Sequence, residues 1–360
     1  MFMGASQRFL APLVMQGVFA ANTTSSIPLK NLGYLAEVRL IFTINFTVVL
    51  GGGSAVAVTG RGKASGNPTP FDLISRVQLF NNQNNALVDV SGWGLYLHNQ
   101  AQRSGYDPNF LTGSLSPINN NPFYTQQPNT GNQVTGSYVV PLTVPVAYKK
   151  SLQGGLLFMQ NQQNSMRVDI TWGAGTFLTL AGGATAVVNS ITVDAQQVYF
   201  MVGPNPEDQP EQSFIYRVQE KTMDITATGE SIMKPDLVQN RHLQRAYTEV
   251  VNNGAGMTAT DVSNIRWQVS GSDNVINTTF NQQQYAQQEF FGRSLPRGLL
   301  AWFFDGGLGA PEFSSPRDVV DLSRVTEFAN IFTISAGTAI ASAYQRTIFE
   351  YLEKVPDSQY

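Results

Sequence analysis

A long alternation of apolar and polar side chains constrains the fold of this chain more than any other feature. From residue 38 to residue 48 every even-numbered position is apolar, and most positions between them are polar. A period of two indicates a β-strand with one buried face. Eleven residues at about 3.3 Å each span on the order of 35 Å, which is long for a strand. The apolar positions are Val38, Leu40, Phe42, Ile44, Phe46 and Val48.

Other alternations predict strands along both halves of the chain. In the first half they fall at residues 71–79, 86–90, 138–146, 166–172 and 191–202, the last with a bulge-like register shift at Gln196 and Gln197. In the second half, residues 214–218 and 265–269 alternate, and the continuous apolar run GLLAWFF indicates a strand covered on both faces. The segment SAYQRTIFEYLEKV also fits helical spacing, but the β-forming residues in its middle favour a strand.

Residues 71–100, FDLISRVQLFNNQNNALVDVSGWGLYLHNQ, predict a hairpin followed by a helix. NNQNN forms the predicted turn, because Asn tolerates left-handed backbone angles and caps its own chain. Ser91 is the predicted N-cap of the helix, with Trp93, Tyr96 and Leu97 at helical spacing behind it. The Trp and His side chains here are therefore expected to join a helix to a sheet.

The length of 360 residues favours two domains, at about 150 residues each. The proline-rich stretch GPNPEDQPEQ marks a linker, and a second helix is predicted from Asn281 to Phe291, ended by Gly292. Each half thus holds many strands, one helix and long loops, which predicts an all-β chain of two tandem eight-stranded antiparallel jelly rolls with short helices and long loops. The expected division is an N-terminal helix or arm (1–30), a first jelly roll (31–203), a linker (204–212) and a second jelly roll (213–360).

The N-terminal segment carries a largely apolar run from Phe9 to Ala21 that resembles a signal peptide. Its basic region is thin, and Pro12 and Gln16 interrupt the run, so we expect a retained apolar helix that docks on another surface. No stretch reaches the roughly 20 apolar residues of a spanning helix. The expected contact residues are Phe2, Phe9, Leu10, Leu13 and Val14.

Composition excludes several functional classes. Charged residues make up 13% of the chain, the net charge is −3 and no basic run stands out, so direct nucleic-acid binding is not expected. The absence of cysteine excludes disulfides, thiolate nucleophiles and Cys-bearing zinc sites. The polar surface must be built largely from amides and hydroxyls, whose long-range fields are weak.

A serine-hydrolase hypothesis follows from short motifs. Ser231 and Lys234 have the Ser-x-x-Lys spacing, residues 272–274 read Ser-Asp-Asn, and residues 221–223 resemble a Lys-Thr-Gly element. The order of the three is wrong for that class of enzyme, and Pro235 biases Lys234 away from the helical conformation that the motif needs. We therefore predict that the chain is not an enzyme and uses no cofactor.

Other candidate sites have simpler structural interpretations. His98 and His242 are the only histidines, which excludes a His-rich metal site. The acids Glu207, Asp208 and Glu211 fall in the linker, and Gly60–Lys63 is expected to be a hairpin tip because it lacks the strand-to-helix context of a phosphate loop.

One long segment and the four tryptophans carry further structural expectations. Residues 104–137 show no sustained period, which indicates a long exposed excursion that covers the top of an assembly or binds neighbours. The four tryptophans, Trp93, Trp172, Trp267 and Trp302, fall on predicted strands or helices and are expected in the core or in subunit contacts.

The chain after about its first thirty residues resembles the double jelly-roll major capsid proteins of tectiviruses, which are tailless icosahedral phages with an internal membrane. The resemblance rests on NLGYLAEVRLIFTI, LISRVQLFNNQNNALVDVSGWGLYLHN, VPVAYKKSLQGGLLFMQNQQNSMRVDITW and SLPRGLLAWFFD. It implies a major capsid protein of the virion. Three chains would form a pseudo-hexagonal homotrimer, and the trimers would tile an icosahedral shell around a membrane-enclosed genome.

The implied partners are neighbouring capsomers, penton and other minor capsid proteins and, through the N-terminal segment, an internal viral membrane. The alternative is a receptor- or glycan-binding spike or minor capsid protein, in which residues 104–137 would recognise the receptor.

Overall fold

The structure, a computed structural model, describes residues 6–49, 70–102, 124–126, 133–148, 154–160, 165–174, 185–203, 209–210, 214–237, 241–270, 273–292, 295, 298–304, 320–322 and 324–354. The chain forms two compact units. The first comprises Met1–Asn99 and Gly105–Glu211, and the second comprises Gln100–Ser104 and Gln212–Tyr360. Each unit is described by itself.

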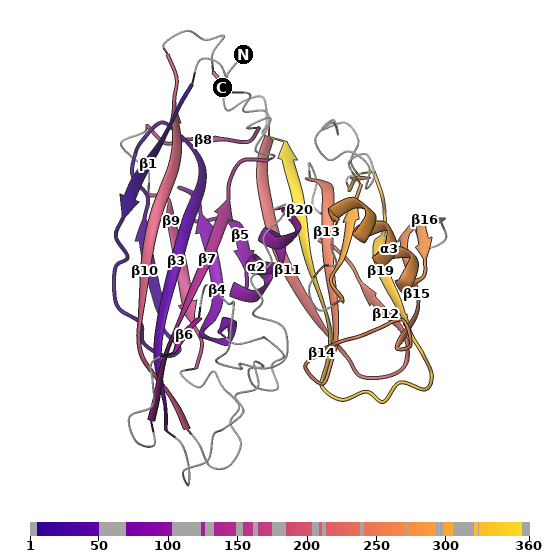
Figure 1. Ribbon diagram of the computed structural model, residues 1–360. Helices are drawn as coiled ribbons and strands as arrows, with labels where there is room; N and C mark the ends of the chain where they lie inside the picture. The colour runs from indigo at the N-terminus through magenta and orange to yellow at the C-terminus, as the bar shows by residue number, and fades with distance from the viewer. Residues whose placement is uncertain are drawn as a thin grey trace. The chain divides into compact units, whose positions relative to one another are not determined.

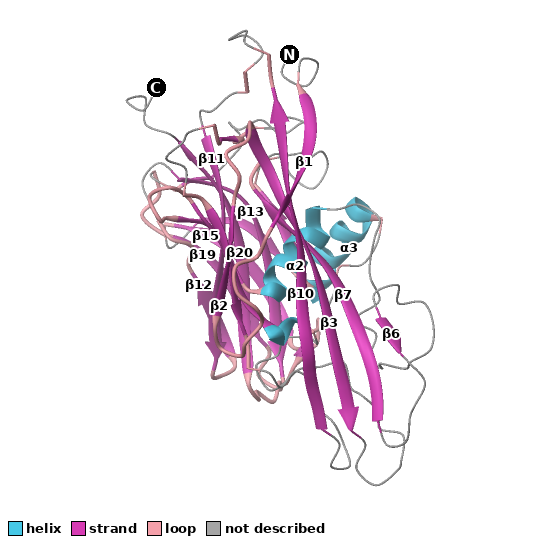
Figure 2. Ribbon diagram, turned by 90° about the vertical axis from the view of Figure 1, so that its left-hand side faces the viewer, coloured by secondary structure: helices cyan, strands magenta, loops and turns pink. Residues whose placement is uncertain are grey.

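The first unit is a sandwich of two antiparallel sheets (Figure 1). One sheet has the strand order β1-β10-β3-β7-β6, with β8 also paired to β3, and the other has the order β5-β4-β9-β2. Figure 2 shows the long strands β3, β7 and β10 running side by side. The elements are β1 (Gln7–Leu13), β2 (Thr24–Pro28), β3 (Tyr34–Val49), η1 (Phe71–Leu73), β4 (Ile74–Phe80), β5 (Ala86–Val90), α2 (Gly92–Gln102), β6 (Tyr124–Gln126), β7 (Gln133–Pro145), β8 (Leu157–Phe158), β9 (Arg167–Trp172) and β10 (Thr185–Met201).

The second unit is also a two-sheet sandwich. One sheet runs β14-β13-β20-β11, with β17 and β18 also paired to β13, and the other runs β12-β19-β15-β16. The elements are β11 (Phe214–Ile225), β12 (Gly229–Met233), β13 (Arg241–Asn252), β14 (Ala255–Gly256), β15 (Val262–Val269), β16 (Asp273–Thr278), α3 (Phe280–Phe291), β17 (Leu300–Phe303), β18 (Val320–Asp321), β19 (Phe328–Ile334) and β20 (Ala343–Lys354).

The two units repeat one strand topology. In each, the first strand pairs with the last (β1 with β10, β11 with β20), and the second pairs with the one before the last (β2 with β9, β12 with β19). The strand that follows pairs with the last strand in both, and each unit has its helix after the fifth strand of this pattern. This arrangement confirms the predicted fold of two tandem eight-stranded jelly rolls. The equivalent strands are β1, β2, β3, β4, β5, β7, β9 and β10 in the first unit and β11, β12, β13, β15, β16, β17, β19 and β20 in the second.

The strand β3 forms where the alternation predicts it. Its even-numbered side chains from Val38 to Phe46 are buried. They share a face with buried residues of the neighbouring strand β7, such as Val140 and Leu142. Burying an aliphatic or aromatic side chain of this size stabilises the fold by about 1.5–3 kcal/mol, so the alternation supplies much of the first core.

The two helices predicted within the jelly rolls are present, each with a side-chain cap at its N-terminus. The Ser91 hydroxyl accepts from the backbone N–H of Gly94 at 2.9 Å at the start of α2. Thr279 and Gln282 form a reciprocal capping box at α3, which ends at Gly292 with φ of 64°. The Trp93 ring packs on Phe71, with centroids 5.2 Å apart, so this aromatic cluster joins a helix to the sheet as predicted.

The predicted N-terminal helix is wrong. Gln7–Leu13 form strand β1, which pairs along its whole length with β10. Two physical reasons account for this: β10 is long enough to offer a free edge, and Pro12 disfavours a helix interior but is tolerated in an edge strand. Since β1 and β2 occupy the places that β11 and β12 occupy in the second unit, residues 7–28 belong to the first jelly roll and are not a separate arm.

Two other predictions need adjustment, and two more are not tested. The segment 104–137 is not irregular throughout, because Tyr124–Gln126 form β6 and β7 begins at Gln133. The β10 register shift against β3 falls between Val198 and Tyr199, next to the predicted position, and a second shift lies between Val188 and Ser190. Most of the predicted linker, residues 204–208 and 211–212, and the Gly60–Lys63 tip lie outside the described residues.

Candidate assembly surface and buried polar networks

The N-terminal strand places the candidate contact residues on different faces. Leu10 and Val14 are 54% and 77% exposed, and Phe9 is partly exposed with its ring stacked 5.6 Å from that of Tyr199. Leu13 points inward and is buried, and Phe2 lies outside the described residues. Of the four expected contact residues that the structure describes, Phe9, Leu10 and Val14 are exposed, and these three are here named the β1 surface.

A charged cluster lies beside the β1 surface on the same unit. The guanidinium groups of Arg8 (β1) and Arg39 (β3) contact one carboxylate oxygen of Glu37, at 3.4 Å and 2.7 Å. Glu37 is buried, whereas both arginines are partly exposed. Two cations share one anion here, so the cluster carries one net positive charge.

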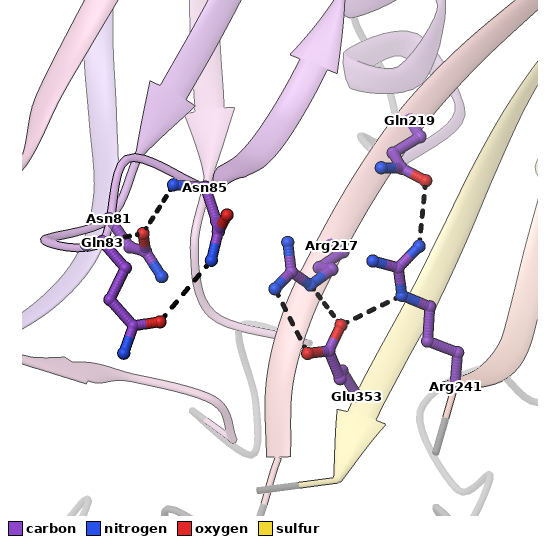
Figure 3. A network of polar contacts seen from close by, with 7 residues as sticks. All are labelled: Asn81, Gln83, Asn85, Arg217, Gln219, Arg241 and Glu353. Atoms are coloured by element: carbon purple, nitrogen blue, oxygen red, sulfur yellow. Dashed lines mark hydrogen bonds and ion pairs between the residues drawn. The ribbon is translucent and has the colours of Figure 1, made fainter. Parts of the chain in front are cut away.

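In the second jelly roll, Glu353 at the end of β20 binds two arginines from the flanking strands (Figure 3). Arg217 of β11 contacts both carboxylate oxygens, with Nη2 donating to Oε1 at 3.2 Å and Nε 2.5 Å from Oε2. Arg241 of β13 donates from Nε to Oε2 at 3.0 Å and from Nη1 to Gln219 Oε1 at 3.4 Å. The bidentate guanidinium–carboxylate pair joins β11 to β20 with fixed geometry, and the Arg241 contact adds β13, so Glu353 links three strands at this end of the sheet.

A second ion cluster is buried in the same sheet. The Arg346 Nε lies 3.1 Å from Glu220 Oε1, and its Nη1 lies 3.4 Å from Glu249 Oε2. All three side chains are less than one-tenth exposed. Desolvation of three charges offsets most of their attraction, so the cluster contributes more to a unique strand arrangement than to net stability.

A buried carboxylate also lies in this sheet, at Glu350. It accepts from Nε2 of Gln102 at 2.7 Å; this residue ends α2 and belongs, with residues 100–104, to the second unit. Burial raises the pKa of Tyr216 and of Tyr247 well above the ordinary value, and the negative charge of Glu350 raises both further. Both phenols are therefore neutral donors beside an anion at neutral pH.

The predicted amide turn between β4 and β5 is confirmed (Figure 3). Asn81 Oδ1 accepts from the backbone N–H groups of Gln83 and Asn85 at 3.1 Å and 2.8 Å. Asn84 adopts φ of 61°, the left-handed conformation for which Asn is suited, and its side chain accepts from Arg167 at 2.7 Å.

The serine-hydrolase motif has no catalytic geometry. Ser231 lies on β12, where its buried hydroxyl donates to Gln345 Oε1 at 3.1 Å. Lys234 follows the end of this strand, and its ammonium pairs with Glu327. The Lys221 ammonium binds Asp236 at 2.5 Å, and residue 272 lies outside the described residues. The Ser231 hydroxyl thus binds an amide and each ammonium binds a carboxylate, so the hydroxyl has no lysine as the base that the hypothesis needs.

The histidines do not form a common site. His98 is buried near the end of α2, and its ring lies 3.5 Å from the Asn99 amide nitrogen. His242 lies on β13, with its ring edge-on to that of Phe214. Among the described residues, no group of three or more His, Asp or Glu side chains has the arrangement of a metal site. Glu207, Asp208 and Glu211 lie outside the described residues.

The tryptophans all lie in the cores, as predicted. Trp93, Trp172, Trp267 and Trp302 are each at most 2% exposed.

None of the helices in the described part of the chain is long and apolar enough to cross a membrane.

Comparison with known proteins identifies the fold. No protein-family model matches the sequence, and no curated protein matches it. Solved structures match over nearly the whole chain. The MCP of Sulfolobus Turreted Icosahedral Virus (STIV) aligns with a TM-score of 0.66 at 14% identity, covering 98% of each chain. The PBCV-1 virus capsid aligns at 0.65 and 11% identity, covering 96% of this chain and 93% of that one.

The major capsid protein P2 of bacteriophage PM2 is similar over the same extent. It aligns with a TM-score of 0.54 at 12% identity, covering 98% of this chain and 100% of that one. At these identities the likeness establishes the fold, and it does so for both jelly rolls and their order in the chain.

Proposed function

We propose that this chain is the major capsid protein of a membrane-containing, tailless icosahedral phage of the tectivirus kind, located in the capsid shell of the virion. The observation that carries this proposal is the repeated strand topology of the two jelly rolls. This topology matches, over nearly the whole length, the PBCV-1 virus capsid and the major capsid protein P2 of bacteriophage PM2. The proposed role is structural. The polar clusters described above join neighbouring strands, and the Ser-x-x-Lys motif lacks catalytic geometry because Ser231 lies in strand β12.

The proposed assembly unit is a homotrimer. Two similar jelly rolls in one chain give six similar wedges in three chains, so a pseudo-sixfold outline arises from threefold symmetry. An obligate interface of this kind buries on the order of 2,000 Å² or more, whereas contacts between trimers are smaller and wetter. The low content of charged residues, 13%, supports close association of copies, because mutual repulsion is weak.

The mass in solution tests the trimer directly. Sedimentation or light scattering of the full chain is expected to give three times 39.3 kDa, and negative-stain images are expected to show particles of hexagonal outline. A stable species of 39.3 kDa at micromolar concentration would contradict the proposal.

The β1 surface is the proposed contact with neighbouring capsomers or with the internal viral membrane. Leu10 and Val14 support this role because each is more than half exposed, Leu10 on the edge strand β1 and Val14 directly after it. Of the expected contact residues, Leu13 serves the core instead. Penton and other minor capsid proteins are further proposed partners of the shell.

Point substitutions test the β1 surface better than deletion does, since deletion of β1 would remove a strand of the first jelly roll. Leu10→Gln with Val14→Gln is expected to reduce particle assembly while leaving trimer mass and thermal stability unchanged. Val275→Gln is the matched control, at an exposed apolar position of the second unit. Unchanged assembly and membrane association in the double variant would show that the β1 surface is not a contact.

A further inference from the structure

The core of the second jelly roll contains polar atoms that no protein group satisfies. In the described part of the chain, both amide atoms of Gln244, the indole Nε1 atoms of Trp267 and Trp302, and Nδ2 of Asn330 have no hydrogen-bond partner. These four side chains are at most 2% exposed. A buried donor or acceptor without a partner costs about 1–3 kcal/mol, so a native core does not carry several of them in one place without another ligand.

Strand register brings these side chains together around Phe304. Trp302 of β17 lies opposite Ala246 of β13, and the backbone N–H of Phe304 donates to the Gln244 carbonyl oxygen at 2.9 Å. Gln244 lies at a register shift of β13 against β20, but against β17 it lies opposite Phe304, whose ring packs on the core residue Trp267. Cross-strand partners share a face, so Gln244 points to the core. The Trp267 ring lies 5.0 Å from that of Phe304 and 6.1 Å from that of Trp302.

Asn330 extends this group toward the opposite sheet. It pairs with Trp267 across β19 and β15, so the two side chains share a face. The amide oxygen of Asn330 is satisfied by Gln345 Nε2 at 2.9 Å and by the Thr248 hydroxyl at 3.4 Å. Only its nitrogen lacks a partner.

The unpartnered atoms are mostly donors. Four nitrogen atoms need acceptors, and Gln244 Oε1 is the single unpartnered acceptor among the five atoms named here. A water molecule accepts two hydrogen bonds and donates two, which matches a site with several donors and one acceptor. Arg245 and Arg266 are next to these residues in sequence, but because side chains alternate along a strand they point to the opposite faces. An anion in the site would therefore lack a counter-cation from either arginine.

We infer that the second jelly roll has an internal hydration site, in which ordered water bridges the Gln244 amide to the indole N–H groups of Trp302 and Trp267. The water would tie β13 and β17 of one sheet to β15 of the other, with the Asn330 amide of β19 at the edge of the site. This inference is independent of the proposed capsid role, since it concerns the interior of one unit.

A high-resolution structure of the full-length wild-type protein tests the inference most directly. Solvent density is expected within hydrogen-bond distance of Trp302 Nε1 and of the Gln244 amide. Direct contact between the Gln244 amide and an indole nitrogen, or apolar atoms filling the space, would overturn it.

A substitution gives an independent test. Gln244→Met keeps the length of the side chain but removes the amide that holds the bridging water. The indole N–H groups are then expected to lose their hydrogen-bond partner. The midpoint of thermal unfolding is expected to fall by at least about 2 °C. The control, Gln284→Met at an exposed position of α3, is expected to leave the midpoint unchanged. An unchanged or raised midpoint in Gln244→Met would mean that the amide is unsatisfied in the native core and would contradict the site.

Discussion

Arg346 and Glu249 face each other across the pairing of β20 with β13, with Arg346 Nη1 3.4 Å from a Glu249 carboxylate oxygen and both side chains buried. Glu220 of β11 contacts the same guanidinium from the other side. One cation therefore binds two buried anions, and the three strands that carry these side chains, β13, β20 and β11, are consecutive in the sheet. The ion cluster gives the sheet one favoured register, because any slip would bury a charge without its partner.

Removal of the shared cation is expected to be severe. Arg346→Met leaves two buried carboxylates without a counter-charge and is expected to lower the free energy of unfolding by about 3–5 kcal/mol. Chemical denaturation measures the change. The control is Arg76→Met, which breaks an exposed pair with Asp89 and is expected to cost less than about 1 kcal/mol. Equal effects of the two substitutions would show that the buried cluster has no special role.

The stability of the second jelly roll is expected to fall at high pH. The pKa values of Tyr216 and Tyr247 are raised by burial and by Glu350, so the unfolded chain loses these phenolic protons first. The stabilisation is fully present below the pKa of an unfolded tyrosine, about 10, and is lost as pH rises above it. The midpoint of thermal unfolding between pH 8 and pH 11 measures the decline. Tyr216→Phe is expected to make the decline shallower, and an unchanged slope in that variant would contradict the assignment to this phenol.

The elements that sequence alone predicted are those with one buried face. In β3 and β7 the apolar residues alternate with polar ones, so Phe42 and Val140 identify the inner face without any knowledge of neighbours. Sequence alternation does not identify β13, because its polar residues, such as Gln244 and Thr248, are buried along with its apolar ones. The same mixture of buried polar and apolar residues made the sequence of β20 compatible with either a helix or a strand.

Long-range pairing set the limits of prediction at the candidate site. The exposure of Leu10 and Val14 could be anticipated from an apolar segment at the chain end, but the strand conformation of β1 depends on an edge of β10 almost two hundred residues later. Likewise, Arg217 and Glu353 are 136 residues apart, and no local signal joins them. Local periodicity reports which face is buried, but not what covers it.

Ser231 is expected to act as a structural residue. Its hydroxyl belongs to a polar bridge through Gln345 and Asn330 that joins the two sheets of the second jelly roll. Ser231→Ala is expected to reduce the free energy of unfolding by about 1 kcal/mol, the usual net value of one hydrogen bond. An acylating probe is expected to leave wild-type Ser231 unlabelled, as followed by mass spectrometry of the intact chain. Stoichiometric labelling at this serine would contradict the structural role and support the hydrolase hypothesis.

The junction between α2 and the sheet of the first jelly roll depends on a glycine. A Cβ atom at Gly92 would lie 2.6 Å from Cβ of Ile74 and 2.7 Å from its carbonyl oxygen, much closer than packed atoms approach. The helix that carries Trp93 and Tyr96 onto Phe71 starts at this residue, so displacement there disturbs the whole aromatic cluster.

Gly92→Ala is therefore expected to destabilise the first jelly roll by about 1–3 kcal/mol, the usual cost of overpacking. Gly203→Ala is the matched control within the same unit, because a Cβ there meets nothing within 4 Å. Denaturant titration followed by tryptophan fluorescence measures both variants, since Trp93 and Trp172 report on this core. If Gly92→Ala were as stable as Gly203→Ala, the helix would have room to shift, and the close approach of Gly92 to Ile74 would not be what sets the position of α2.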